Sequence, residues 1–206
     1  MSTAIDRIHT AAMRVLAEKG GSTVAISDLA REAGLSRGTI YNNLEEPATL
    51  FDAVCDMVAG EMADRLQESV SDLEDPAARL SNVIRLCVRR VHEEPHWGRF
   101  VARYAVKEPK LSNFWGRFPA RELHRGIESG RFDLGSDQVA SVAGTLGGAT
   151  FGAMTLVLHG HRSWRQAGSD AAEVMLRGIG IEKREARLLA AADFDPLPRM
   201  LFSDAA

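Results

Sequence analysis

The chain has 206 residues, of which 45% are hydrophobic and 26% are charged. This composition supports one or two domains with a real core and excludes a disordered chain. The net charge of −3 does not by itself indicate a nucleic-acid binder. Cys55 and Cys87 lie far apart, so neither a disulfide framework nor a zinc site is expected. The first residues lack the basic-then-apolar pattern of a signal peptide, which favours a cytoplasmic protein.

Two helices are predicted at the start of the chain. Residues 3–19 place apolar side chains on one helical face, and the run stops at Gly20-Gly21. A second helix is expected to be capped by the Ser27 hydroxyl and to end at Ala33. Good helix formers dominate the composition and few stretches alternate with period two, so the sequence predicts an all-α chain.

A glycine turn leads into a third helix. Gly34 supplies the positive φ that a tight turn needs, and Ser36 is placed to cap residues 37–44. Pro47 then suits the first turn of a fourth helix, because an N–H is unpaired there in any case. Two short helices joined at a glycine form a helix-turn-helix unit, whose second helix lies in the DNA major groove.

The polar side chains of the third helix are the candidate DNA contacts. Arginine pairs with guanine, asparagine pairs with adenine, and the threonine methyl group contacts that of thymine. The candidate DNA-binding residues, including the two capping serines, are Ser27, Ser36, Arg37, Gly38, Thr39, Tyr41, Asn42 and Asn43. The spacing alone also fits an ordinary helical hairpin with a polar face toward solvent.

Prolines and apolar periodicity predict further helices in the rest of the chain. Pro119 is expected to kink one of them, and Asp137 is expected to cap another. The predicted segments are 76–94, 96–107, 110–129, 138–160, 169–178 and 182–192. The chain is therefore predicted to have a helix-turn-helix domain at 1–46, extending to about 60 with the connecting helix, and a helical bundle at 47–206.

Residues 85–125 are basic and rich in aromatic side chains. Ten Arg or Lys residues stand against four acids, with aromatic residues between them. This pattern suits an anionic, partly apolar ligand whose carboxylate or phosphate pairs with Arg90 or Arg103. The candidate ligand-binding residues are Cys87, Arg90, Trp97, Phe100, Arg103, Tyr104, Phe114, Trp115, Phe118 and Met154. A second nucleic-acid patch, or a bundle with an aromatic core and solvated arginines, is the alternative.

A stretch of twenty residues, 139–158, has no formal charge and carries Gly144, Gly148 and Gly152 at intervals of four. Three glycines inside a helix cost about 2–3 kcal/mol relative to alanine. A close helix–helix contact is expected to offset that cost, so we predict a dimer interface here, with close packing inside one subunit as the alternative. The length also fits a membrane span, but small residues dominate and no basic cluster flanks either end, so no membrane is expected.

The sequence contains no enzyme signature. It has no Gly-x-Ser-x-Gly elbow, P-loop, His-Glu-x-x-His or kinase motif, and no cofactor is expected. His92 and His96 are four residues apart, but Pro95 breaks the helix between them, so no metal site is expected. A helical enzyme and a protein-binding adaptor without DNA binding are the alternative functions.

The stretch TVAISDLAREAGLSRGTIYNNLEEPATLFDAV resembles the DNA-binding domain of TetR-type transcriptional repressors. The Asp-Leu-Ala-x-x-Ala-Gly turn, the Ser-x-Gly-Thr-Ile-Tyr recognition helix and the Leu-Phe start of helix four follow in the family's order. The resemblance covers about residues 4–60. It implies a homodimeric repressor that binds a palindromic operator and is released by a small-molecule inducer, with the eighth and ninth helices forming the dimer interface.

The sequence departs from this family at two positions. Where the family usually has an aromatic residue and a phosphate-binding lysine, this chain has Leu44 and Pro47, the latter preceded by Glu45 and Glu46. The first fifty residues carry five basic and six acidic side chains. We therefore expect weak sequence-independent attraction to phosphate, with affinity depending on helix N-termini and base contacts.

Overall fold

The structure is a computed structural model that describes residues 3–44 and 46–198, except for the side chain of Phe114. Throughout these residues the regular structure is helical, with no strand, which confirms the predicted all-α class. The elements are α1 (Ala4–Lys19), α2 (Ile26–Ala33), α3 (Arg37–Asn43), η1 (Pro47–Thr49), α4 (Leu50–Ser69), α5 (Pro76–Glu93), α6 (Pro95–Tyr104), α7 (Pro109–Glu128), η2 (Ser136–Gln138), α8 (Val139–Leu158), α9 (Trp164–Gly178) and α10 (Lys183–Ala191).

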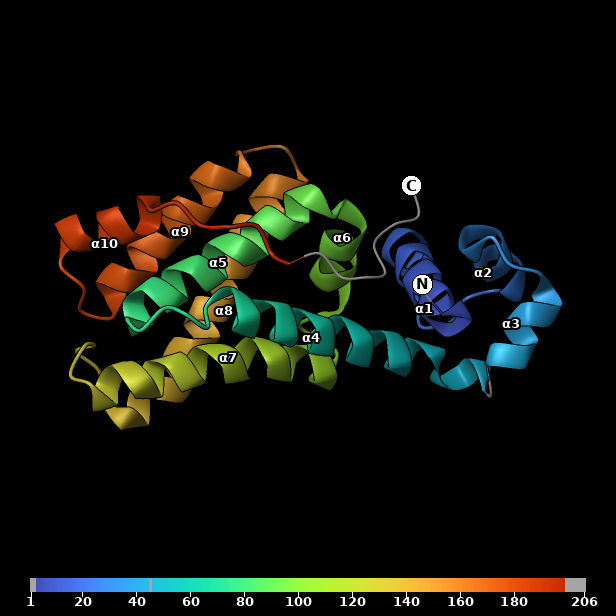
Figure 1. Ribbon diagram of the computed structural model, residues 1–206, viewed down its shortest axis with the longest axis horizontal. Coiled ribbons are helices and arrows are strands. Elements are labelled where there is room, and N and C mark those ends of the chain that lie inside the picture. The colour runs from blue at the N-terminus through green and yellow to red at the C-terminus, as the bar shows by residue number, and fades with distance from the viewer. Residues whose placement is uncertain (1–2, 45, 199–206) are drawn as a thin grey trace.

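The first three helices, α1 to α3, lie at one end and are joined to a bundle by the long helix α4 (Figure 1). Pro47 opens this connection, as predicted, but through the 3-10 turn η1 that precedes α4. Helix α4 contacts α1 at one end and α7 further along. Helix α6 also packs against α1, so both α4 and α6 link the bundle to the first three helices.

The starts of two bundle helices differ from prediction. Asp137 does not cap the long helix, because it lies inside η2, where Gly135 is the N-cap residue. Helix α9 begins at Trp164, five residues earlier than expected, because the Ser163 hydroxyl accepts a hydrogen bond from the N–H of Gln166 at 3.3 Å. Pro119 lies inside α7, which continues through it.

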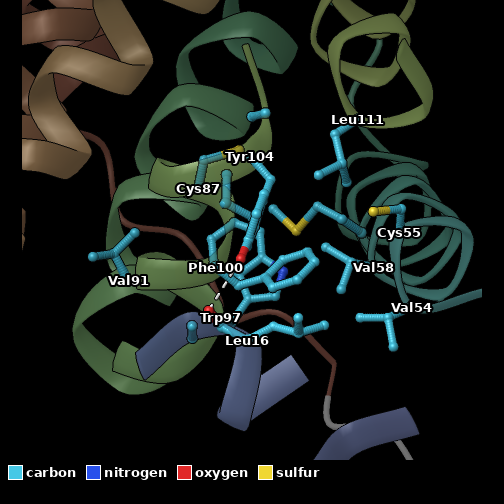
Figure 2. Packing of buried hydrophobic residues seen from close by; sticks show 14 of the residues in the cluster. Leu16, Val54, Cys55, Val58, Cys87, Val91, Trp97, Phe100, Tyr104 and Leu111 are labelled. Carbon is cyan, nitrogen blue, oxygen red and sulfur yellow. Dashed lines mark hydrogen bonds between the residues drawn. The ribbon is translucent and has the colours of Figure 1, made fainter. Parts of the chain in front are cut away.

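An aromatic cluster forms the junction between the bundle and the first helices. Trp97, Phe100 and Tyr104 of α6 lie at its centre, and all three are buried (Figure 2). Leu16 of α1 and Val58 of α4 border the cluster. The single proton of the Tyr104 hydroxyl is donated mainly to the carbonyl of Gly21 at 2.7 Å, with the carbonyl of Leu16 at 3.2 Å as a second, weaker acceptor. Helix α6 is thus fixed to the C-terminal end of α1.

A buried ion pair joins α5 to α7. The Arg79 guanidinium donates to the two carboxylate oxygens of Glu122 at 2.6 and 3.2 Å. The side chains are 3% and 0% exposed, respectively. Arg79 also donates to the carbonyls of Val70 and Leu73, beyond the end of α4. The pair therefore holds three parts of the bundle together.

Helix α8 is central to the bundle. It packs against α5, α6, α7 and α9, with Ala143, Leu146 and Met154 among its buried residues. Together with the preceding turn, it is the one candidate membrane span among the described residues, by length and composition only. The core helix of a soluble protein meets the same criteria, so this finding is weak evidence for a membrane.

Candidate DNA interface and ligand pocket

The turn between α2 and α3 has helix-turn-helix geometry. Gly34 has a φ of 61°, the positive value predicted from the sequence, which glycine adopts without steric cost. The Arg7 guanidinium of α1 donates to the carbonyls of Ala33 at 2.6 Å and Gly34 at 3.2 Å. These bonds satisfy carbonyl groups at the end of α2 and hold α1 against the turn. Sequence reasoning missed Arg7, because no local pattern identifies partners that distant in the chain.

The outer face of α3 is polar and exposed. The Ser36 hydroxyl accepts a hydrogen bond from the backbone N–H of Thr39 at 3.0 Å, so Ser36 caps the helix as predicted. Ile40 points inward and is fully buried, whereas Tyr41 is 61% exposed. Asn42 is exposed as well. The side chains of Tyr41 and Asn42 are therefore accessible to a partner outside the chain.

Two further candidates on α3 are exposed but differ in their surroundings. The Asn43 side-chain amide donates to the Thr39 carbonyl at 2.8 Å, so it is already engaged within the helix. A Cβ added at Gly38 would meet nothing closer than the Ser36 Oγ at 3.7 Å, an ordinary contact. The packing of the described residues therefore does not require glycine at this position.

The prediction that Ser27 caps α2 is wrong. The helix begins at Ile26, with Ala25 in the N-cap position and no side-chain cap. Ile26 packs against the core, and burial of this apolar side chain fixes the start of the helix two residues earlier than predicted. Ser27 is exposed in the first turn, where the helix dipole and unpaired N–H groups favour an anion.

Most basic side chains of the first fifty residues interact within the chain. Lys19 and Arg31 both pair with Asp28, at 2.6 and 2.8 Å, and Arg14 pairs with a glutamate of α2 at 3.5 Å. Arg37 is exposed and forms no ion pair or hydrogen bond with another described residue. It is therefore a basic side chain of this region that is available to a partner outside the chain.

A small apolar cavity lies between α4, α5, α7 and α8. Its volume is about 20 Å³, enough for about one water molecule. The Thr150 hydroxyl, which donates to the Leu146 carbonyl at 2.8 Å, is the most polar group on its lining. The lining residues are Leu66, Leu80, Val83, Ile84, Cys87, Trp115, Phe118, Pro119, Leu146, Gly147 and Thr150. None of them carries a charge.

Only some of the predicted ligand-binding residues line the cavity. Three of them line it, namely Cys87, Trp115 and Phe118. Four others pack in the core and do not line it, namely Trp97, Phe100, Tyr104 and Met154. The side chain of Phe114 lies outside the described residues. The sequence could not separate these groups, because aromatic residues in a core and in a ligand site have the same helical spacing.

Neither predicted arginine reaches the cavity. Arg90 is 2% exposed and donates to Glu61 at 2.8 Å and to Glu94 at 2.9 Å, so its charge is already paired. Arg103 lies exposed on α6, beside Gly20. The structure therefore places neither guanidinium where it could bind an anionic ligand in this cavity.

The two cysteines behave as apolar side chains. Burial raises the pKa of the Cys55 and Cys87 thiols to about 12. Both thiols are therefore protonated near neutral pH, and neither has the thiolate character of a reactive cysteine. Cys87 contributes an apolar wall to the cavity.

Two family models match this chain. The model described as "Bacterial regulatory proteins, tetR family" matches residues 8–44, which include α2 and α3. The model described as "Tetracyclin repressor-like, C-terminal domain" matches residues 75–192, more than half of the chain. The chain belongs to the TetR family.

Similar proteins include a curated transcriptional regulator and proteins of solved structure. An uncharacterized HTH-type transcriptional regulator from Mycobacterium tuberculosis is 27% identical over 92 residues, covering 45% of this chain and 46% of that protein. The match thus spans about half the length of this curated relative. The structure of RolR with resorcinol is 26% identical, with a TM-score of 0.70, covering 95% of this chain and 96% of that chain. FadR from Bacillus subtilis with stearoyl-CoA, at 20% identity and a TM-score of 0.70, covers 84% of this chain and 98% of that chain and shows the shared fold alone.

In this TetR-family chain the glycine stripe of α8, formed by Gly144, Gly148 and Gly152, faces outward. All three glycines are exposed, and a Cβ added at any of them would meet no heavy atom within 4 Å. Among the described residues, close packing inside one subunit therefore does not explain them. Leu156 continues the stripe and is 41% exposed. The stripe is open to a second molecule.

Proposed function

We propose that this chain is a DNA-binding transcriptional regulator and that it acts as a repressor. The observation that carries this proposal is the exposed polar face of α3, which presents Arg37, Tyr41 and Asn42 opposite the buried Ile40. A helix with hydrogen-bonding side chains on one face fits the major groove, where base edges are read. Proposed phosphate contacts come from the exposed N-terminal turns of α2 and α3.

The test is binding to the DNA upstream of its own gene. We expect specific complexes whose affinity falls as salt is raised, because phosphate contacts release counterions. The decrease of affinity with increasing salt should be shallow, since most basic side chains near α3 are paired within the chain. Absence of specific DNA binding would favour the alternatives, a helical enzyme or a protein-binding adaptor.

Asn42→Ala is expected to weaken operator binding by about 1–3 kcal/mol, the contribution of one good base contact. Asn43→Ala is the matched control, because the Asn43 amide already donates to the Thr39 carbonyl. We expect a smaller loss for the control. Fluorescence anisotropy at fixed salt measures both affinities, and circular dichroism checks that both variants fold. Equal losses for the two variants would contradict a specific role for Asn42.

We also propose that the protein is a cytoplasmic homodimer that reads a palindromic operator. The glycine stripe of α8 supports this assembly, because its open surface lets a second backbone approach closely. A two-fold dimer would place two α3 helices about 34–36 Å apart, one turn of DNA, on the two half-sites.

The proposed inducer is small and largely apolar, with few polar groups. The cavity lining supports this choice, because Thr150 supplies its one hydroxyl and it carries no charged side chain. The relative RolR was solved with resorcinol, a small uncharged aromatic diol. The anionic inducer predicted from the sequence finds no support in this lining.

Inducer binding must enlarge the cavity, which holds about one water molecule in this structure. Enlargement separates α4, α5, α7 and α8, and α4 packs directly against α1 of the DNA-binding helices. The inducer releases DNA only if it binds the DNA-incompetent conformation more tightly than the competent one. A thermal-shift and DNA-release screen of neutral phenols against matched carboxylic acids tests its charge. Release by the acids alone would contradict an apolar, uncharged inducer.

Tyr104→Phe is expected to change how strongly inducer binding in the bundle affects DNA binding by the first three helices. The variant removes the hydroxyl that donates to the carbonyls of Leu16 and Gly21. One net hydrogen bond corresponds to about a 2- to 10-fold shift in the inducer concentration that half-releases DNA. Inducer affinity measured without DNA serves as the control and should change less. An unchanged release curve would show that this contact does not carry the signal.

A further inference from the structure

A second cleft, of about 300 Å³, lies between α5, the start of α9 and the segment after α10. Three guanidinium groups and two aromatic rings define it, from Arg85, Arg89, Arg165, Trp164 and Phe194. We refer to these five residues as the arginine cleft. One carboxylate, that of Asp193, is also on the lining, and Arg89 forms an ion pair with a glutamate of α5, so the cleft together with that glutamate has a formal charge of +1.

Arg85 is buried without a carboxylate partner. It is 7% exposed, and the other three buried arginines of the described chain each form an ion pair with a glutamate. Among the described residues Arg85 has no such pair, and its hydrogen bond to the Leu189 carbonyl is long, at 3.4 Å. Burial lowers the pKa of the Arg85 guanidinium, and the nearby Asp193 carboxylate does not cancel this effect. A buried charge normally requires a hydrogen-bonded counter-ion, which this part of the chain does not supply.

The guanidinium groups lie over the aromatic rings of the cleft. Arg85 lies over the Phe194 ring at 4.3 Å, and Arg165 lies over the Trp164 ring at 4.4 Å. Arg89 also approaches the Trp164 ring, at 5.1 Å, although its Nε donates to a glutamate of α5 at 2.7 Å. A stacked guanidinium keeps its N–H groups in its own plane, where they can bind an oxyanion in a bidentate manner.

We propose that the arginine cleft binds a small organic anion that carries a carboxylate or a phosphate on an apolar body. The oxyanion accepts hydrogen bonds from Arg85, and the charge of Arg165 adds to the attraction. The apolar body packs against Trp164 and Phe194. The site is separate from the uncharged cavity proposed for the inducer, and it does not depend on DNA binding.

The experiment titrates the full-length protein by calorimetry with benzoate, phenyl phosphate and the neutral benzamide. We expect the wild-type protein to bind benzoate or phenyl phosphate, and the stronger of the two identifies the preferred oxyanion. Benzamide should bind at least about tenfold more weakly, because it lacks the charge. Arg85→Met and Arg165→Met should each weaken anion binding at least about tenfold. Arg187→Met is the control, because this exposed arginine of α10 lies outside the cleft.

Thermal unfolding separates binding from folding. Arg85→Met should keep or raise the melting temperature without ligand, because it removes a buried charge that lacks a counter-ion. Arg165→Met tests the site independently, since Arg165 is exposed and its loss leaves the core intact. The proposal is overturned if neither anion binds at millimolar concentration, if benzamide binds equally well, or if both cleft variants bind the anions as the wild-type protein does.

Discussion

Glu122→Gln is expected to lower the free energy of unfolding by about 3–5 kcal/mol, the usual cost of breaking a buried ion pair by removing one partner. The Glu122 side chain is fully buried and binds Arg79 through both oxygens, the shorter contact being 2.6 Å. The amide cannot neutralise the guanidinium, which is left buried between α5 and α7. Urea unfolding measures the decrease in the free energy of unfolding. The dependence of this free energy on urea concentration shows whether the substitution has also changed the compactness of the unfolded state.

The matched control for this prediction is Glu128→Gln, a substitution of the same chemistry at an exposed position of α7. We expect its stability to stay within about 0.5 kcal/mol of the wild-type value, as for most surface substitutions. The double variant Arg79→Met with Glu122→Met should recover much of the loss, because both charges are removed together. A loss for Glu122→Gln as small as that of the control would show that the pair does not stabilise the fold.

Gly148→Leu is expected to convert the dimer into a monomer. A leucine side chain meets open space within one subunit, but it overfills a close contact between two α8 helices, at a cost of about 1–3 kcal/mol in each copy. Operator affinity should fall by at least about a hundredfold, because the two half-sites are no longer bound by one linked molecule. Light scattering gives the mass, and fluorescence anisotropy gives the affinity.

Gly60→Leu provides the control for the assembly prediction. Gly60 is also exposed inside a helix, α4, and a Cβ there likewise meets no heavy atom within 4 Å. Leucine has a higher helix propensity than glycine. Apart from any effect on the dimer contact, both substitutions should therefore raise the free energy of unfolding of the monomer by up to about 1 kcal/mol. A dimer of unchanged mass and full operator affinity for Gly148→Leu would show that the glycine stripe has another role.

The sequence by itself determined the features that depend on neighbours a few residues apart. The turn at Gly34, the cap at Ser36 and the order of the helices follow from φ preferences, side-chain caps and apolar periodicity. The same local reasoning failed at Ser27, where packing of Ile26 against the core outweighed the preference of serine for the cap. A cap contributes about 1 kcal/mol, which burial of a large apolar side chain can exceed.

Only the tertiary structure decided which charged and aromatic side chains share an environment. Arg79 pairs with Glu122, 43 residues away, and Arg90 pairs with Glu61, 29 residues away, so neither arginine is free to bind a ligand. Arg85 lies in the same helix, α5, as these two arginines, but it lies against Phe194 without a carboxylate partner in the described chain. These differences arise from how distant helices pack, and helical periodicity specifies which residues share a face but not which partner that face meets.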